Sequence, residues 1–281
     1  MRQRAFCWLI LALLALPAYA DPILGAAGSF AVLGGTGTVT NSGPSTITGD
    51  LGVYPGTSIT NTGGITINGV SYPGGTTVPN DAVAATYTAS TDAYNALAAM
   101  PVPSTNILTG ENLGGLTLTP GVYDFASSAQ LTGTLYLNGE GNKNALWVFI
   151  IGSTLTTASG SSVVFENLGS APDDGVFWDV GSKATLGTTT AFEGNILAVS
   201  SITLETGASI GCGSALAQAS VTLDGNTIST GCSGGGTLTN GVVTPLGYAA
   251  ATPEPGTWLL LGSGLAGLAG MVRRKKIGLR A

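Results

Sequence analysis

Short apolar segments alternate with small polar residues along most of the chain. Segments of four to six residues rich in Val, Ile, Leu, Thr and Phe are separated by Gly, Asn and Ser. Such a pattern is typical of short β-strands joined by tight turns. The sequence therefore predicts a mainly β fold.

One stretch, residues 80–100, breaks this pattern and predicts a helix. It contains no Gly and no Pro and is rich in Ala. Asn80 can cap the helix, Asp81 favours its first turn, and the prolines at 101 and 103 end it. A stripe at helical spacing, which we interpret as a packing face rather than a ligand site, comprises Val83, Tyr87, Ser90, Tyr94 and Leu97.

Three kinds of strand recur in a fixed order after this helix. The middle kind is a Ser- and Thr-rich motif, at 128–132, 153–156, 182–185, 201–204 and 220–223. An apolar strand precedes three of these motifs, at 146–151, 176–180 and 196–199, and a third strand follows them, at 162–165, 189–192 and 208–210. Three strands per repeat of roughly 20–30 residues predict a triangular β-solenoid, or β-helix. A β-sandwich is the alternative; it explains the number of strands but not their repeated order.

The apolar strands also predict where the helix lies. Residues 147–151 are apolar on both sides of the strand, which indicates a strand covered on both faces. The long helix is the only large element available as a cover. We therefore expect it to pack alongside the solenoid, parallel to its axis.

The first 20 residues read as a secretory signal peptide. Arg2 and Arg4 precede an apolar stretch, and residues 18–20 form a small-x-small cleavage site. An uncleaved N-terminal anchor is the alternative, although the apolar run is short for a membrane span.

The C-terminal end, residues 253–281, predicts a second targeting signal. Pro253, Glu254 and Pro255 precede an apolar run at 258–272 and a basic cluster at 273–276. An apolar span followed by basic residues predicts a membrane anchor with a cytoplasmic end. The combination resembles the PEP-CTERM sorting signal. The resemblance implies processing by an exosortase, a transient inner-membrane anchor through residues 256–272, a Gram-negative cell surface and often an exopolysaccharide.

The body between the two signals, residues 21–252, is acidic. It holds 14 acidic residues and two basic ones, Lys143 and Lys183, for a net charge of −12. Such a surface repels nucleic acid and anionic lipid, which excludes a nucleic-acid-binding function. Its last part, 233–252, reads as a Gly-rich linker to the sorting signal.

Two cysteines remain after loss of the signal peptide, Cys212 and Cys232. In an oxidising compartment we expect them to form a disulfide. A metal pair or a reactive thiol are the alternatives, although the chain has no His and no further Cys in the body.

Motifs in a fixed order across residues 24–232 resemble the microbial ice-binding family. They are residues 30–33, 45–52, 55–56, 92–95, 119–123, 131–135, 177–181 and 221–223. The resemblance implies a discontinuous β-solenoid with a long helix alongside, over a domain of residues 21–232. One departure lies at 211–218, where many members carry Arg and this chain has an insertion with Cys212.

A Thr column on the middle strands is the candidate ice-binding site. Stacked strands lie about 4.8 Å apart and alternate residues about 6.6 Å apart, so a solenoid face forms a regular array. Threonine is stiff at χ1 and presents a methyl and a hydroxyl together. Aligning the motifs places their apolar neighbours (Leu131, Leu155, Ala184, Ile202 and Val221) inward and gives an outward column of Thr132, Thr156, Thr185, Thr203 and Thr222. The alternative is that Thr is simply a favourable outward residue on a strand.

The columns beside this one carry charges, which hold their own hydration. One contains Gln130, Thr154, Lys183, Ser201 and Ser220, and the other contains Thr134, Ala158, Gly187, Glu205 and Asp224. The active face could therefore lie on the N-terminal coils instead, with Thr36, Thr38, Thr40, Thr46 and Thr48. A register slip of one residue would turn every side chain over.

Enzyme classes find little support in the sequence. The absence of His excludes His-based triads and imidazole metal sites, so no metal or other cofactor is expected. We predict a non-enzymatic extracellular protein that adsorbs to ice. A structural or adhesive matrix protein on the same scaffold is the alternative function.

Overall fold

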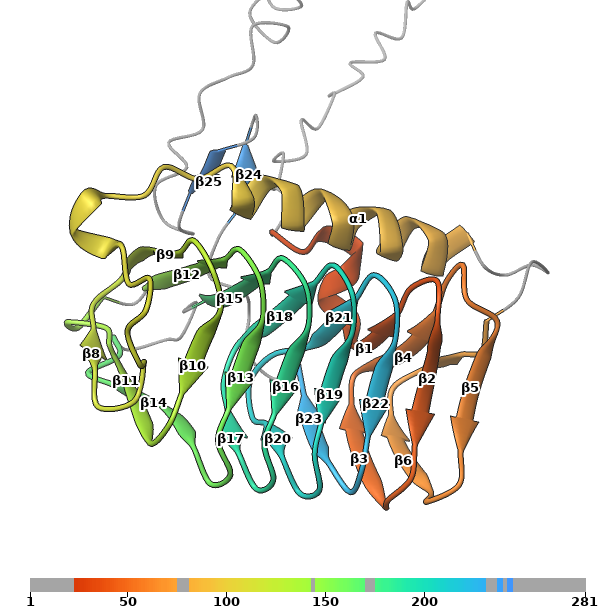
Figure 1. Ribbon diagram of the computed structural model, residues 1–281. Coiled ribbons are helices and arrows are strands. Elements are labelled where there is room, and N and C mark those ends of the chain that lie inside the picture. The colour runs from red at the N-terminus through yellow and green to blue at the C-terminus, as the bar shows by residue number, and fades with distance from the viewer. Residues whose placement is uncertain are drawn as a thin grey trace, which may run out of the picture. The chain divides into compact units, whose positions relative to one another are not determined.

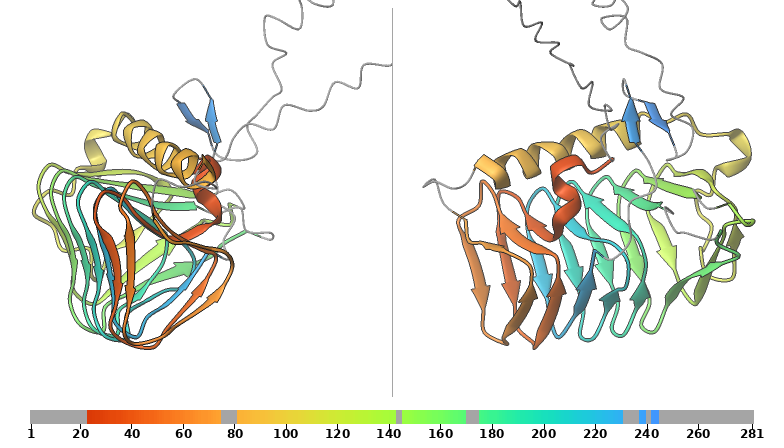
Figure 2. Two further views of the ribbon diagram at one scale, coloured as in Figure 1. Left: turned by 90° about the vertical axis from the view of Figure 1, so that its right-hand side faces the viewer. Right: turned by 180° about the vertical axis from the view of Figure 1, so that it is seen from behind.

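The computed structural model of this chain describes residues 23–74, 81–142, 145–169, 175–230, 237–239 and 242–244. The described segments within residues 23–230 form a solenoid whose three faces are three parallel sheets (Figures 1 and 2). Each coil contributes one strand to each sheet, as the repeated order of strand kinds predicts. The fold is therefore the mainly β, triangular solenoid with one long helix that the sequence indicates, not a sandwich.

The first sheet has eight strands and carries the helix. Its strands lie in the order β7 (Ser71–Tyr72), β4 (Asp50–Val53), β1 (Phe30–Gly34), β21 (Ala215–Ala217), β18 (Asn195–Ala198), β15 (Gly175–Val180), β12 (Leu146–Ile151) and β9 (Gly121–Phe125). The C-terminal strand β21 lies between β1 and β18, so coils from opposite ends of the chain adjoin.

The second sheet has seven strands. Their order is β10 (Ala129–Leu131), β13 (Leu155–Thr157), β16 (Ala184–Leu186), β19 (Ile202–Leu204), β22 (Val221–Leu223), β2 (Thr38–Asn41) and β5 (Ser58–Asn61). The break in chain order recurs here, because β22 pairs with β2 in parallel.

The third sheet has eight strands and completes the triangle. Their order is β6 (Ile65–Asn68), β3 (Ser45–Thr48), β23 (Thr227–Ser229), β20 (Ser209–Ile210), β17 (Ala191–Phe192), β14 (Ser162–Glu166), β11 (Thr134–Asn138) and β8 (Thr117–Leu118). Outside the solenoid, β24 (Thr237–Thr239) and β25 (Val242–Thr244) form an antiparallel pair.

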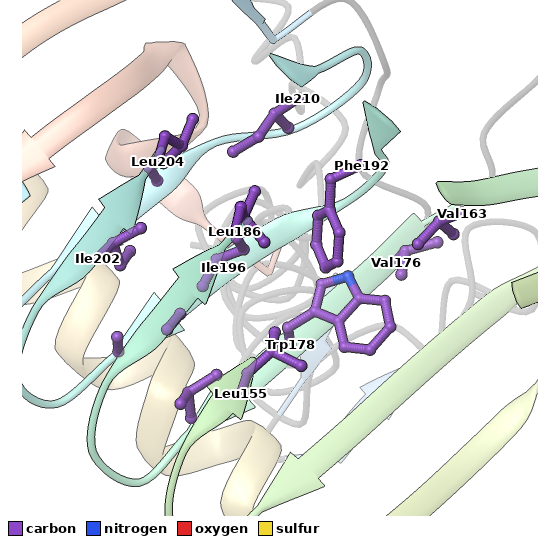
Figure 3. Close-up of a cluster of buried hydrophobic side chains, with 14 of the residues drawn as sticks. Leu155, Val163, Val176, Trp178, Leu186, Phe192, Ile196, Ile202, Leu204 and Ile210 are labelled. Carbon is purple, nitrogen blue, oxygen red and sulfur yellow. The ribbon is translucent and has the colours of Figure 1, made fainter. Parts of the chain in front are cut away.

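Inward side chains from all three sheets fill the solenoid with apolar groups. Strands of the second sheet contribute Leu155, Leu186, Ile202 and Leu204, which lie near Trp178 of the first sheet (Figure 3). Aromatic rings stack along the axis, with centroids 4.0 Å apart for Phe149 and Trp178. Because stacked coils repeat the same inward positions, each layer packs on the next.

The helix α1 (Asp81–Ala98) covers the outward side of the first sheet, where the doubly apolar strands predict it (Figures 1 and 2). Of its stripe, Val83 and Leu97 are fully buried, in one cluster with Val148, Phe177 and Leu197 of the sheet. Two short 3-10 helices, η1 (Gly25–Ser29) and η2 (Ser104–Asn106), flank the structure, and η1 packs in the same cluster.

Candidate functional site

The register of the second sheet aligns threonines on six neighbouring strands. Parallel pairing places Thr156 beside Thr185, Thr185 beside Thr203, and Thr203 beside Thr222. The column then continues across the break in chain order, from Thr222 to Thr40 and from Thr40 to Thr60. We call the outward-facing column Thr156, Thr185, Thr203, Thr222, Thr40 and Thr60 the threonine column.

Alternation along each strand shows that the threonine column faces outward. Its members are exposed or half-buried, whereas the inward residues beside them are buried on every strand but β5, where Ile59 is half-buried and Asn61 is exposed. The predicted inward residues Leu155, Ala184, Ile202 and Val221 all belong to the core. No hydrogen bond joins the hydroxyls of Thr185, Thr203 and Thr222 to the described part of the chain, which leaves these groups to water.

Thr132, which we predicted as the first member of the column, does not belong to it. The residue beside Thr156 is Gln130, and Leu131 lies beside Thr157. Thr132 follows β10 at the corner toward the third sheet, where its backbone N–H donates to Asn112 Oδ1 at 2.9 Å. The alignment of this strand by its Leu-Thr pair was therefore wrong.

The length of the corner between sheets explains this error. Phe125 lies beside Ile151 at the end of the first-sheet strands, and Ala129 lies beside Leu155 four residues later in both coils. A constant corner length therefore fixes the register, and the strand 129–131 has Ala129 where 155–157 has Leu155. Counting from the end of the preceding apolar strand would have found this register from the sequence.

Charged groups beside the threonine column lie on its middle coils. In the column two residues before it, the strands present Ser128, Thr154, Lys183, Ser201, Ser220, Thr38 and Ser58. In the column two residues after it, they present Thr132, Ala158, Gly187, Glu205, Asp224, Ser42 and Thr62. The β2 and β5 coils are thus free of charge on this face, and the predicted flanks differ only at β10.

The alternative site on the N-terminal coils is divided between two sheets. Thr38 and Thr40 lie on β2 and extend the second-sheet face, so part of this alternative merges with the predicted column. Thr46 and Thr48 lie on β3 of the third sheet instead, beside Thr227 and Ser229. Thr36 is exposed in the preceding corner, where its hydroxyl lies 3.4 Å from the Gln218 carbonyl.

Two residues of this face were missed by the sequence analysis. Thr60 lies before the predicted helix, outside the region where the repeat is clear, and only its pairing with Thr40 reveals it. Asn41 is buried at the corner beside Thr40, and its Nδ2 donates to Gly43 O at 2.7 Å and Asn61 Oδ1 at 2.9 Å. Ser45 Oγ donates to Asn41 Oδ1 at 2.7 Å, so this asparagine ties the two N-terminal coils together.

The strongest electrostatic perturbations lie away from the second sheet. Asp179 faces the helix from β15, is 1% exposed, and its Oδ1 has no hydrogen-bond partner in the described structure. Burial raises the pKa of Asp179 to about 8. Burial also raises the pKa of Glu193, to about 7, against a smaller opposing effect of the Cys212 backbone N–H. Desolvation, and then the neighbouring Asp179 charge, raise the pKa of the Tyr94 hydroxyl on α1.

Several predicted features fall outside the described residues. These are Cys232, the sorting motif Pro253, Glu254 and Pro255, the signal peptide and the expected anchor at 256–272. Cys212 itself follows β20. Within the described ranges, no helix has both the length and the apolar character of a membrane span, and no cluster of His, Cys, Asp or Glu could hold a metal ion.

The solenoid and the C-terminal segment each match a different known family of sequences. The ice-binding-like family matches residues 32–229, and the PEP-CTERM protein-sorting motif matches residues 251–275. An ice-binding protein from Nostoc sp. (strain HG1) is 50% identical over 256 residues, which cover 90% of this chain and 87% of the relative.

The solenoid is also similar to solved structures of ice-binding proteins. The crystal structure of an ice-binding protein from the Antarctic ascomycete Antarctomyces psychrotrophicus has a TM-score of 0.67 and 37% identity, covering 75% of this chain and 98% of that one. A domain of ice-binding protein 1 from Shewanella frigidimarina has a TM-score of 0.62 and 32% identity, covering 74% of this chain and 97% of that domain.

Proposed function

This chain belongs to the ice-binding-like family, and we propose that it adsorbs to ice through the outward face of its second sheet. The proposed site is the threonine column with its uncharged neighbours on β2 and β5. The proposal involves no catalysis and no cofactor, since a surface that adsorbs to a crystal needs only a fixed array of groups.

The six in-register threonines are the observation that supports this site. Adjacent members are spaced by the strand separation of about 4.8 Å, and their stiff side chains hold methyl and hydroxyl groups at regular intervals. Hydroxyls without a partner in the described chain can hydrogen-bond to ordered water, and the methyl groups between them limit other water positions. Such an array suits adsorption to a solid whose water positions are themselves periodic.

The uncharged part of the second-sheet face is the part best suited to contact with ice. Lys183, Glu205 and Asp224 flank the column beside the threonines of β16, β19 and β22, and each holds its own hydration shell. On β2 and β5 the same flanking positions carry Thr38, Ser58 and Thr62 instead. We therefore propose that the coils that contain β2 and β5 contribute most of the ice contact.

The C-terminal match supports export as part of the function. The sorting motif at 251–275 is typical of proteins that reach the surface of Gram-negative bacteria. We propose that residues 256–272 anchor the chain in the inner membrane until an exosortase-type enzyme removes them, and that Cys212 and Cys232 form a disulfide after export. An exopolysaccharide partner stays a prediction from the sorting signal alone.

Ice activity of the purified protein tests the proposal. We expect thermal hysteresis and inhibition of ice recrystallisation in the wild type, and loss of most of both in Thr203→Tyr. Thr227→Tyr is the control, because Thr227 is an exposed outward residue on the third sheet, one coil along from Thr203. A folded wild-type protein without ice activity would refute the function, and equal losses in both variants would refute the site.

A further inference from the structure

The two ends of the solenoid differ in how they are closed. At one end, β5, β6 and β7 are each the last strand of their sheet, so all three sheets stop at the same coil, which faces the viewer in the left view of Figure 2. Among the described residues these strands pair on one side only. Residues 58–72 therefore present unpaired backbone edges on three sides of one coil; we call this coil the open end.

The core is also unfinished at the open end. Ile59 lies beside Val39, and Ile67 lies beside Ile47. Val39 and Ile47 are fully buried, whereas Ile59 and Ile67 are only partly buried. Val70, at the corner between β6 and β7, is 51% exposed. Covering these side chains would remove apolar surface from water, which is favourable.

The opposite end is closed by irregular chain. Leu113 and its neighbours lie over the last coil there, where Leu113 N–H donates to the Gln130 carbonyl and Leu108 N–H donates to the Asp124 carbonyl. Glu111 is exposed in the same segment. An irregular backbone and a charge are both devices that prevent edge-to-edge pairing. At the open end, residues 58–61 and 65–68 are regular strands, and the acid in contact with this coil is Asp50, whose Oδ1 accepts from Val70 N–H at 2.8 Å.

Charge identifies what can cover the open end. Residues 51–80 contain no charged side chain, although the body as a whole carries 14 acidic and two basic residues. Two copies of this chain therefore repel one another over most of their surfaces but meet less like charge end to end, where the acid in contact with the coil is Asp50 beside Val70. We infer that the open end is a homodimer interface, at which residues 58–72 of one copy pair with the same residues of a second copy.

Two-fold symmetry fits the geometry of this interface. An axis perpendicular to the solenoid and through the second sheet places β5 antiparallel to β5 of the other copy, with β6 against β7. On the other side of the triangular cross-section, the same axis passes through the corner between the third and first sheets. Val70 lies at this corner. Val70 thus meets its own copy. If the threonine column is the ice-binding site, as proposed above, the two columns join into one longer array.

Sedimentation velocity without ice tests this inference independently of the proposed function. We expect the purified full chain to sediment as a monomer–dimer equilibrium, and Val70→Asp to raise the dissociation constant at least about tenfold, because two like charges meet at the axis beside the Asp50 carboxylates. Val199→Asp is the matched control, since Val199 is 39% exposed in the middle of the solenoid and the charge change is the same. A monomeric wild type, or equal effects of the two variants, would overturn the inference.

Backbone hydrogen exchange locates the contact. Amides of residues 58–72 should exchange more slowly as the protein concentration rises, while those of 107–118 at the closed end should not change. Protection at both ends would indicate head-to-tail association and would overturn the two-fold dimer. Association through the C-terminal segment would leave both ends unprotected, and this result would also overturn the two-fold dimer.

Discussion

The first and second sheets belong to the same coils, yet their outward faces have opposite chemistry. On the first sheet, Val148, Phe177 and Leu197 face outward and are buried beneath α1. On the second sheet, the equivalent outward positions hold the threonine column, which no described element covers. The backbone is the same, so the outward side chains alone decide whether a face becomes core or surface.

A substitution on the covered face of the first sheet should have the largest effect on stability. Phe177→Ala removes a fully buried ring between α1 and β15, and such a change costs roughly 3–5 kcal/mol. Thr203→Ala on the bare face should change the free energy of unfolding by only about 0.5 kcal/mol. Urea unfolding of the two variants measures the contrast. Similar costs for both would mean that the second sheet is also covered in solution.

Asp179 is an acid on the covered face and should make the stability of the protein depend on pH. Its pKa is raised to about 8 in the folded protein, so the unfolded chain loses the proton first as pH rises. Asp179 should therefore lower stability between about pH 4 and pH 8, with the loss levelling off above, by at most about 6 kcal/mol. Asp179→Asn should remove the larger part of this slope, and the remainder should come from Glu193, whose pKa is also raised, to about 7.

Urea midpoints at pH 5 and pH 9 measure the effect. The wild type should lose stability over this interval, and the Asn variant should be more stable than the wild type at pH 9. Glu205→Gln on the bare face is the control and should leave the slope unchanged, because Glu205 is exposed. A wild type that is equally stable at both pH values would contradict the buried, unpartnered carboxyl.

Replacing Lys183 should have a smaller effect, and this effect should be on ice activity rather than on stability. Lys183→Thr removes the only positive charge beside the threonine column on the described second sheet, so we expect higher thermal hysteresis. Its effect on the free energy of unfolding should stay within about 0.5 kcal/mol, as for other exposed positions. Lower activity in this variant would indicate that the charge itself takes part in ice contact.

Thr132→Tyr should have the smallest effect. The register places Thr132 beyond the threonine column at the corner of the last complete coil, so the added ring stays clear of the proposed contact. Thermal hysteresis close to that of the wild type is the expected result. A loss as large as that of Thr203→Tyr would show that the face extends to this corner.

Much of this arrangement could be predicted from the sequence, because it depends on local patterns. Period-two strands, the Gly-free segment at 81–98 and the doubly apolar strands indicated the solenoid, the helix and the side it covers. The inward neighbours of the column, such as Ile202 and Val221, followed from alternation alone. Family resemblance added the expectation that the solenoid is discontinuous.

The remaining features depend on contacts between distant parts of the chain. Nothing local shows that β22 pairs with β2, because every middle strand offers the same alternation to its neighbours. The extension of the column to Thr40 and Thr60 could therefore not be read from the repeat. The position of Thr132 was a different failure, since aligning similar letters ignored the fixed corner between sheets.

The pairing of β22 with β2 is the centre of this account, because it joins threonines 182 positions apart in the sequence into one face. The most direct test is the adsorption of fluorescently labelled protein to a single ice crystal, for Thr40→Tyr, Thr222→Tyr and the third-sheet control Thr227→Tyr. We predict that Thr40→Tyr and Thr222→Tyr both lose adsorption while the control keeps it. Loss in only one of the two, or in the control as well, would contradict a single ice-binding face built across the break in chain order.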